Sequence, residues 1–285
     1  MIAQETYTLY NGVTVPKLGL GTWMIDDGVA AQAVKEAVKL GYRHIDTAQA
    51  YGNEKGVGEG VRSCGVKRDE LFVTTKLAAE IKSYDEAARA IDGSLKAMGL
   101  EYLDLMLIHS PWPWAHFGSS DRFFEGNKAA WRAMEDAHKA GKIRAIGISN
   151  FQKEDSDNLL ASCTVKPMVN QVLAHVTNMP TELIDYSKGV GMMVEAYSPM
   201  GHGELFKNQA LVEMAGRYGV SLAQLCIRYT LQHGLLPLPK TANPKHMENN
   251  AALDFVISDD DMKALDAMKK IEHYGDASVF PVYRG

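Results

Sequence analysis

Short apolar runs rich in β-forming residues alternate with longer segments of helical spacing along the whole chain. The apolar runs begin near Leu18, Tyr42, Leu71, Leu103, Ile143, Met168, Gly191 and Leu235. The longer segments, such as AAQAVKEAVKLG and SLAQLCIRYTLQHG, carry their apolar residues on one face at i, i+3 and i+4 spacing. Glycines stand where four of these helices should end: Gly41, Gly99, Gly141 and Gly234. Eight strand-helix units in series, with no Pro-, Gly- or Ser-rich linker between them, predict an α/β fold, a (β/α)8 TIM barrel forming a single domain over residues 1–285.

Two segments lie outside this eightfold pattern. TYTLYNGVTVP has Asn-Gly between apolar residues, which predicts an N-terminal β-hairpin that plugs the bottom of the barrel. ISDDDMKALDAMKKI predicts a C-terminal helix with Ser258 as its N-cap. The aromatic, loop-like stretch EHYGDASVFPVYRG follows this helix, and we expect it to fold over the mouth of a substrate site.

Composition and charge narrow the class of protein. With 46% apolar and 23% charged residues, the 285-residue chain can bury a full core and stay soluble. The net charge of −5 gives no overall basic field, so neither nucleic acid nor a membrane surface is expected as a partner. The three widely spaced cysteines suit a reducing compartment, and no signal peptide or membrane span is evident, so we expect a cytoplasmic protein. No heptad pattern is present, which favours a monomer.

Four chemically active side chains are expected on one rim of the barrel, because functional groups of this fold gather where strands end. They are Asp46 at the end of the second strand, Tyr51 in the loop after it, Lys76 at the end of the third strand and His109 at the end of the fourth. A Lys ammonium near a Tyr phenol favours the phenolate and lowers the phenol's pKa, while an Asp keeps the ammonium charged and oriented. Such a set forms a proton donor, and a neutral His donates a hydrogen bond to a carbonyl oxygen.

These residues lie in motifs that resemble those of the aldo-keto reductase superfamily. HIDTAQAYGNE, TTKL and LIHSP, together with GLGTW, GISNF, AYSPMG and LPLPK, match its signatures in order over nearly the whole chain. The pattern is most similar to the bacterial-type branch of 2,5-diketo-D-gluconate and glyoxal (methylglyoxal) reductases. The resemblance implies a barrel enzyme that reduces aldehydes and ketones with NADPH. It also implies that Tyr51 is the general acid, that Lys76 and Asp46 tune it, and that His109 orients the substrate carbonyl.

A cofactor site follows from the same resemblance, since no glycine fingerprint of a Rossmann dinucleotide fold is present. Similar proteins lay an extended cofactor over the barrel rim. The resemblance assigns the nicotinamide carboxamide to Ser149, Asn150 and Gln171, the face of its ring to Tyr197, and its border to Gly21, Thr22, Trp23 and Asp46. The residues beneath the pyrophosphate would be Ser198, Pro199, Met200, Gly201 and Leu205.

The segment KTANPKHMENN resembles the adenosine-phosphate motif of the family. Lys240 and Thr241 would bind the 2′-phosphate, and Asn250 the adenine edge. The family usually has Arg where this chain has His246, and Glu where it has Asn249. Because a neutral His lacks the bidentate fork of Arg, we expect NADPH as the cofactor with weakened selectivity, so that NADH is also used.

The substrate site is expected to be apolar and aromatic, as reductase pockets normally are. Its predicted members are Trp23, Tyr51, His109, Ser110 and Trp112, with Trp114, Phe117, Tyr274, Phe280 and Tyr283 as further apolar candidates. Many relatives have Trp where this chain has Ser110, which predicts a wider and more polar pocket. The possible charged clamps His116, Arg122 and Arg284 are interpreted as surface residues. The substrates would be small carbonyls such as α-dicarbonyls or keto-sugars.

Two alternatives remain open at this point. A metal-dependent hydrolase on the same barrel would use His44 and Asp46 as ligands, but the first strand has no His-x-His, and Lys76 would add a positive charge beside the metal, so no metal is expected. The second alternative is a regulatory subunit that binds a nicotinamide nucleotide without turnover. A Tyr tuned by Lys and Asp has no physical purpose there, and a Tyr51→Phe variant would separate the two.

Overall fold

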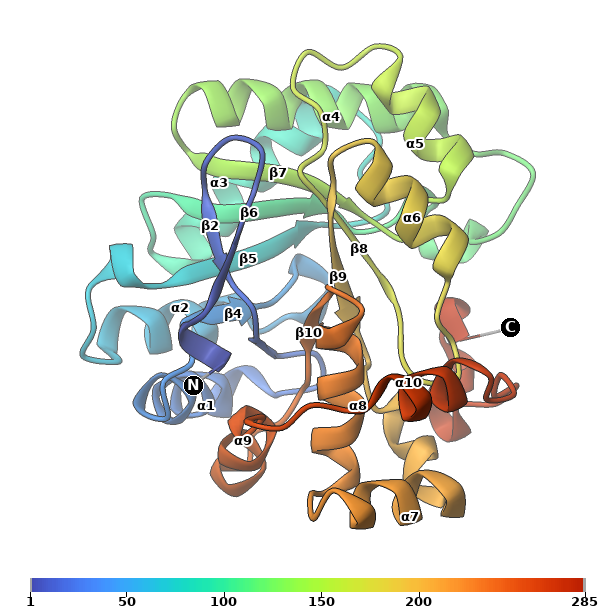
Figure 1. Ribbon diagram of the computed structural model, residues 1–285. Coiled ribbons are helices and arrows are strands. Elements are labelled where there is room, and N and C mark those ends of the chain that lie inside the picture. Colours follow the sequence, from blue (N-terminus) through green and yellow to red (C-terminus); the bar gives the residue numbers. More distant parts are fainter. Residues whose placement is uncertain (1, 284–285) are drawn as a thin grey trace.

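Eight parallel strands form the barrel that the alternating pattern predicts, in a computed structural model that describes residues 2–283 (Figure 1). In chain order they are β3 (Gly19–Gly21), β4 (His44–Asp46), β5 (Phe72–Leu77), β6 (Leu103–Ile108), β7 (Ile143–Ser149), β8 (Val169–Leu173), β9 (Met193–Tyr197) and β10 (Leu236–Leu238), and each pairs with the next. The backbone N–H of Gly21 donates to the carbonyl oxygen of Pro239 at 3.1 Å, and Gly21 forms a parallel bridge with Lys240. These contacts bring the last strand back to the first.

Helices connect successive strands, with α9 following the last one, and cover the outside of the barrel (Figure 1). They are α1 (Asp27–Lys39), α2 (Glu54–Ser63), α3 (Tyr84–Met98), α4 (Phe124–Lys139), α5 (Lys153–Leu160), α6 (Thr181–Gly189), α8 (Leu222–Gln232) and α9 (Pro244–Ala251). All four glycines predicted to end a helix have positive φ. Gly99, at +62°, ends α3 and donates its N–H to the carbonyl oxygens of that helix's last turn.

The predicted hairpin closes the N-terminal end of the barrel. Its strands β1 (Thr6–Thr8) and β2 (Thr14–Pro16) are antiparallel, and Gly12 in the turn has a φ of +86°. Leu9 and Val15 are buried in one cluster with the interior side chains Phe72 and Leu105 of the barrel strands. The hairpin therefore completes the apolar core at this end, as the sequence predicts.

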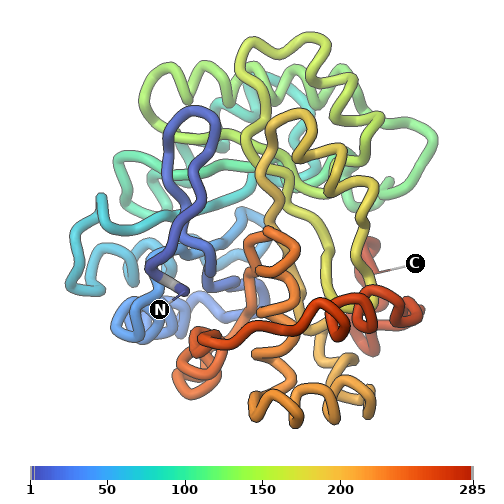
Figure 2. The backbone as a smooth tube through the Cα atoms, in the orientation of Figure 1, coloured from blue at the N-terminus to red at the C-terminus, as the bar shows by residue number. Residues whose placement is uncertain are grey.

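The C-terminal part begins with the predicted capped helix. In α10 (Asp259–Asp266) the Ser258 hydroxyl accepts a hydrogen bond from the Asp261 N–H at 3.2 Å. Between α9 and α10 the chain crosses α8 (Figure 2). There Gln232 Nε2 donates to the carbonyl oxygen of Ile257. After α10 the chain turns back toward the barrel in two short 3-10 turns, Gly275–Val279 and Pro281–Tyr283.

One insertion was not predicted. Between β9 and α8 the chain forms a 3-10 segment, Gly201–Lys207, and the helix α7 (Gln209–Arg217). Buried Leu205 and Leu211 from this insertion pack in one cluster with Leu265 of α10. The insertion and α10 therefore share a second, smaller core beside the barrel.

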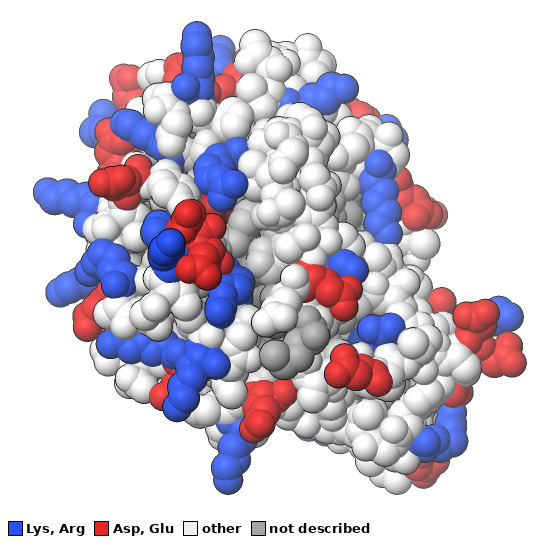
Figure 3. Space-filling view, turned by 60° about the vertical axis from the view of Figure 1, so that its left-hand side comes forward, with Lys and Arg blue, Asp and Glu red and all other residues white. Residues whose placement is uncertain are grey.

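The surface shows mixed charge. On the face drawn in Figure 3, basic and acidic side chains are interspersed, as expected for a chain with 30 Lys and Arg and 35 Asp and Glu. Among residues 2–283, no helix has both the length and the apolar content needed to cross a membrane.

Candidate active site

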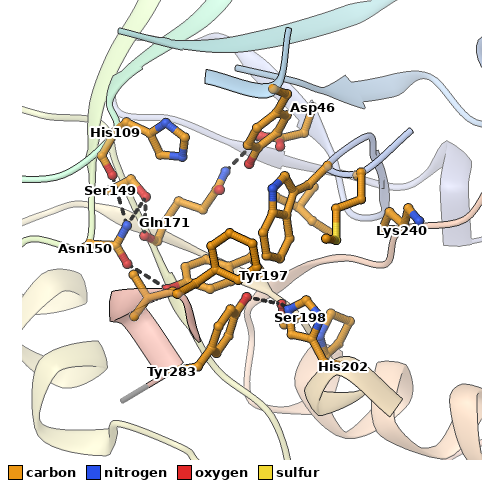
Figure 4. Close-up of a pocket in the computed structure, with 18 of the residues that line it drawn as sticks. Asp46, His109, Ser149, Asn150, Gln171, Tyr197, Ser198, His202, Lys240 and Tyr283 are labelled. Atoms are coloured by element: carbon orange, nitrogen blue, oxygen red, sulfur yellow. Dashed lines mark hydrogen bonds between the residues drawn. The ribbon is translucent and has the colours of Figure 1, made fainter. Parts of the chain in front are cut away.

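A cavity of about 550 Å³ opens at the C-terminal ends of the barrel strands (Figure 4). Of the residues predicted to form the site, those that line it are Gly21, Trp23, Asp46, Tyr51, His109, Ser149, Asn150, Gln171, Tyr197, Ser198, Pro199, Met200 and Lys240. Three of the additional aromatic candidates also line it, namely Trp114, Phe280 and Tyr283. The site thus combines strand ends with the tail that the sequence places over the mouth.

Lys76 is buried in contact with Asp46 and Tyr51, which both line the cavity, and its ammonium group is fully engaged. Its Nζ donates to Asp46 Oδ1 at 2.6 Å, to the carbonyl oxygen of Thr47 at 2.9 Å and to Tyr51 Oη at 3.3 Å. An ammonium has three hydrogens, so these three acceptors fix its position. The side chain is 0% exposed, and this buried charge is compensated by the paired carboxylate.

The phenol of Tyr51 is subject to opposing effects. Burial raises its pKa, the Lys76 ammonium lowers it, and Asp46 raises it, so that the pKa of Tyr51 lies above its ordinary value of 10. The expectation of a lowered pKa is therefore not met, because burial outweighs the charge of Lys76. For Lys76 itself, burial lowers the pKa, but Asp46 and Tyr51 raise it further, and the net direction is upward. Tyr51 thus holds its proton, and Lys76 its charge, at neutral pH.

His109 packs between two aromatic rings at the cavity wall. Its ring centroid lies 5.6 Å from that of Tyr51 and 5.0 Å from that of Trp114, both edge-on. Burial, together with the charge of Lys76, lowers the pKa of His109 well below 6.5, so the imidazole is neutral. Nδ1 is buried without a partner among the described residues, which leaves Nε2 to meet a ligand.

Ser149 and Asn150 use their polar groups mainly within the protein. Asn150 Nδ2 donates to the carbonyl oxygen of His109 at 2.9 Å and to Ser149 Oγ at 3.2 Å, and its Oδ1 accepts from Tyr197 Oη at 2.7 Å. Ser149 Oγ donates to the carbonyl oxygen of Gln171 at 2.9 Å. This chain of bonds, visible in Figure 4, fixes the Tyr197 ring at the cavity wall.

A buried glutamate that the sequence analysis did not single out lies behind this wall. Gln171 Nε2 donates both to Asp46 Oδ2 at 2.9 Å and to Glu195 Oε2 at 2.7 Å. Burial and the nearby Asp46 raise the pKa of Glu195 to about 8, whereas Gln171 and Lys76 lower it. The available signal was a single charged residue within the apolar strand GMMVEAYS, two positions before Tyr197.

The cavity fits the nicotinamide part of a cofactor. Gln171 Oε1 accepts no hydrogen bond from the described residues, although Gln171 lines the cavity, so it is available to a carboxamide. The Tyr197 ring, held by its hydroxyl, provides an aromatic surface on which a planar ring can stack. Lys240 is exposed at the rim, where its charge can meet a phosphate.

Several residues assigned to the cofactor lie outside the cavity. Buried Thr22 donates from Oγ1 to the carbonyl oxygen of Asp46 at 2.9 Å and so supports the strand end. Gly201 and Leu205 are buried within the 3-10 segment Gly201–Lys207 itself. The remaining four assigned residues lie in α9 and in the turn before it. Thr241 and Asn250 are buried, and His246 is exposed. Asn249 Nδ2 donates to Ser221 Oγ at 2.8 Å. Their role toward an adenosine phosphate stays a prediction.

The structure places Ser110 and Trp112 away from the cavity. Ser110 is 0% exposed, and its Oγ accepts from the N–H of Trp112 at 3.1 Å. Trp112 is buried with its Nε1 donating to the carbonyl oxygen of Ser119, and Arg122 lies 4.7 Å above its ring. Trp114 lines the cavity instead. The wider pocket expected from Ser110 stays a prediction.

The other candidates have structural partners. Arg122 pairs with Asp155 through Nε at 2.9 Å and Nη2 at 2.5 Å, which ties the loop after β6 to α5. Phe117 packs against Trp112 and Trp114 outside the cavity lining. Tyr274 Oη bonds to His175 Nε2 at 2.9 Å and anchors the tail. His116 is exposed, and Arg284 lies outside the described residues.

The structure adds cavity residues that the sequence analysis missed. His202 has a φ of +55°, and its ring lies edge-on to Trp23 at 5.1 Å and to Tyr283 at 4.5 Å. Tyr283 Oη also bonds to Ser198 Oγ at 2.8 Å. Met24 and Phe206, both largely exposed, lie at the opening. The 201–207 segment and the tail therefore meet Trp23 over the cavity.

The ligand pair proposed for a hydrolase has other partners. His44 Nε2 bonds to Thr74 Oγ1 at 2.9 Å, and burial, together with Lys76, lowers the pKa of His44 to about 3. Asp46 is engaged by Lys76 and Gln171. In the part of the chain that the structure describes, no three His, Cys, Asp or Glu side chains are grouped as they would be around a metal ion.

Comparison with known proteins agrees with this geometry. Residues 17–270 match the Aldo/keto reductase family. The chain is 43% identical over 274 residues to the glyoxal reductase of Bacillus subtilis (strain 168), covering 95% of each. It is 39% identical over 273 residues to the 9,11-endoperoxide prostaglandin H2 reductase of Trypanosoma cruzi (strain CL Brener), covering 94% of this chain and 93% of that protein.

Solved structures agree in fold over most of the chain. An aldo/keto reductase from Brucella melitensis has a TM-score of 0.85 at 35% identity and covers 92% of this chain and 98% of its own. A Bombyx mori aldo-keto reductase in complex with NADP has a TM-score of 0.85 at 31% identity over 99% of each chain. The protein is therefore an enzyme that belongs to the Aldo/keto reductase family.

Proposed function

We propose that this enzyme reduces small aldehydes and ketones to alcohols with NADPH, and that Tyr51 supplies the proton. The observation that carries the proposal is the contact of the buried Lys76 ammonium with Tyr51 Oη and Asp46 Oδ1 beside an open cavity. Membership of a reductase family leaves the metal-dependent hydrolase and the non-catalytic subunit without support.

The residues divide the work of carbonyl reduction. The reduced nicotinamide, when bound, supplies the hydride for the carbonyl carbon. His109, neutral in its buried setting, donates a hydrogen bond that orients the carbonyl oxygen. Tyr51 transfers its hydroxyl proton to that oxygen, so that one hydride and one proton yield the alcohol. The phenolate left on Tyr51 lies beside the Lys76 ammonium, which stabilises it, and Asp46 keeps that ammonium in place.

The choice of cofactor rests on the groups near the rim. Gln171 Oε1 and the Tyr197 ring are suited to the carboxamide and the face of a nicotinamide. Exposed Lys240 provides a positive charge for the 2′-phosphate, and His246, on the first turn of α9, replaces the stronger Arg. We infer a preference for NADPH with measurable use of NADH. The NADP-bound Bombyx mori relative supports the first part of this inference.

The substrate class follows from the lining of the cavity. Trp23, Trp114 and Phe280 give it aromatic walls, and His109 is the polar group beside Tyr51. Such a site suits small carbonyl compounds whose reactive group reaches Tyr51. The similarity to a glyoxal reductase favours α-dicarbonyls as the first compounds to test, followed by keto-sugars.

The test is the oxidation of NADPH by purified protein with a panel of aldehydes, α-dicarbonyls and keto-sugars, with Tyr51→Phe assayed in parallel. We expect Tyr51→Phe to lower kcat by about 10²-fold to 10⁴-fold, because the proton donor is lost, and to keep its affinity for NADPH. Tyr10→Phe is the matched control, since Tyr10 is exposed at the far end of the barrel. Turnover by Tyr51→Phe within threefold of the wild type would reject Tyr51 as the acid.

A further inference from the structure

The side-chain amide of Gln171 lies between two carboxyl groups. Gln171 on β8 is the register partner of Glu195 on β9, and Asp46 reaches it from β4 across the barrel interior. Both carboxyl groups accept from Nε2, at 2.9 Å for Asp46 Oδ2 and 2.7 Å for Glu195 Oε2. An amide nitrogen has two hydrogens, so both are used. Figure 4 shows the side chain directed toward Asp46.

This double contact determines which way the amide faces. If the amide were rotated by half a turn, its carbonyl oxygen would lie against two carboxyl groups, one of them the carboxylate that Lys76 pairs with. The observed orientation leaves Oε1 without a partner among the described residues, on a side chain that lines the cavity. Gln171 therefore presents an acceptor to the ligand.

We propose that Glu195 is a positioning residue, which holds the Gln171 amide so that its carbonyl oxygen accepts a hydrogen bond from the nicotinamide carboxamide. Glu195 itself does not line the cavity and acts only through Gln171. This inference rests on the proposed use of a nicotinamide cofactor. By orienting the carboxamide, the pair fixes which face of the ring is directed at the substrate.

A purely structural role would not need a carboxyl group here. Glu195 is 0% exposed, and its neighbours on the strand, Val194 and Ala196, are buried apolar residues. Its Oε1 has no partner among residues 2–283, so the group forms one hydrogen bond at the expense of a large loss of solvation. An apolar side chain would fill this space at lower free energy. The bond to Gln171 is the only gain that the described contacts offer.

The charges that face Glu195 are compatible with this role. Asp46 on β4 and Lys76 on β5 form a neutral pair, and Glu195, with its pKa raised to about 8 by burial and by Asp46, is largely uncharged at neutral pH. Its carbonyl-type oxygen still accepts a hydrogen bond in that state. Glu195→Gln keeps such an oxygen, whereas Glu195→Met keeps the length of the side chain and removes the acceptor.

The experiment measures binding in the absence of substrate. Wild type, E195Q and E195M are titrated with NADP+, with its 3-acetylpyridine analogue, in which a methyl ketone replaces the carboxamide, and with adenosine 2′,5′-bisphosphate. We expect E195M to bind NADP+ about fivefold more weakly than wild type, which is the size of one net hydrogen bond. E195Q should stay within twofold. Neither variant should change the affinity for the analogue or for the bisphosphate.

A double-variant comparison separates positioning from packing. In a Gln171→Leu background, E195M should have no further effect on NADP+ binding, because the group through which Glu195 acts is gone. Equal weakening of NADP+ and bisphosphate binding by E195M would overturn the inference, as would unchanged NADP+ binding. If wild type itself fails to bind NADP+, the proposed cofactor is wrong. If E195M does not fold, E195A is used in its place, because it removes the same acceptor with a smaller side chain.

Discussion

The two ends of the barrel are built from the same eight strands but filled with different side chains. At the N-terminal end, Phe72 and Leu105 pack against Leu9 and Val15 of the hairpin, all of them buried and apolar. At the C-terminal end the interior holds Asp46, Lys76, Gln171 and Glu195, also buried but polar or charged. The strand β5 contributes Phe72 to the first layer and Lys76 to the second.

The difference shows how one strand serves two purposes. Apolar side chains at the closed end stabilise the barrel by about 1.5 to 3 kcal/mol each on burial. The buried ion pair at the open end contributes little or nothing to stability, because desolvation offsets the attraction between the charges. Substitutions at the closed end should therefore lower stability and spare activity. Removal of one partner of the ion pair at the open end should lower activity and, because it leaves a buried charge unpaired, stability as well.

Among substitutions that compare the two ends, the largest effect is expected for Lys76→Met, which removes the charge at the open end. The phenolate form of Tyr51 loses its stabilising ammonium, and Asp46 is left buried without its partner. We expect kcat to fall about 10³-fold, within the range typical for acid catalysis. Lys17→Met, at an exposed ion pair beside the hairpin, is the matched control. Initial rates with NADPH and a reactive aldehyde provide the measurement, and a loss below tenfold would contradict the role of Lys76.

At the closed end, Leu105→Ala should lower the free energy of unfolding by about 3 kcal/mol, because it leaves a void in a fully buried layer. The kcat of the folded protein should stay within twofold of wild type. Denaturant unfolding curves and rates measured well below the midpoint test the two statements separately. A large loss of kcat with little loss of stability would mean that the two ends are not independent.

Burial of Glu195 at the open end should make the free energy of unfolding depend on pH. The folded protein keeps the Glu195 proton up to a pKa of about 8, whereas the ordinary pKa is 4.5. Between these values each rise in pH favours the unfolded state, which loses the proton more readily. The stability of E195Q relative to wild type should therefore rise with pH, by up to about 1.4 kcal/mol per pH unit.

Unfolding curves of both proteins from pH 5 to pH 8 measure this difference. Glu5→Gln at the closed end is the control, because the hydrogen bond from Lys17 lowers the pKa of Glu5, and no increase of this kind is expected. A constant difference between E195Q and wild type across the window would show that Glu195 is ionised throughout it.

The smallest effect is expected outside the cavity, at His246→Arg on α9. Arg adds a planar, permanently charged donor near the predicted 2′-phosphate position. The preference for NADPH over NADH should rise about threefold to tenfold, with the affinity for NADH unchanged. Titrations with both cofactors provide the ratio. An equal change for both would place His246 away from the 2′-phosphate.

The barrel, and Tyr51 with the three residues around it, could be predicted because both follow from local pattern. Periodicity locates the strands, and strand ends locate Asp46, Lys76 and His109. Local sequence could not decide whether Trp112 or Trp114 lines the cavity. Trp112 packs under Arg122, and Arg122 is held by its hydrogen bond to Asp155 on α5, which is distant in the sequence. The prediction that the pKa of Tyr51 is lowered was wrong for a related reason. Burial raises this pKa, and the amount of burial depends on the whole fold.

The wall of the cavity joins Trp23 to Phe280, whose ring centroids lie 4.9 Å apart although the residues are far separated in the sequence. During translation Trp23 leaves the ribosome long before Phe280 is made. A nascent chain stalled after β10 would already have the strand ends that carry Asp46, Lys76 and His109, but not this wall. Prematurely terminated or proteolytically trimmed products that lack the tail would thus keep the polar strand ends but lose the aromatic wall that Phe280 forms with Trp23.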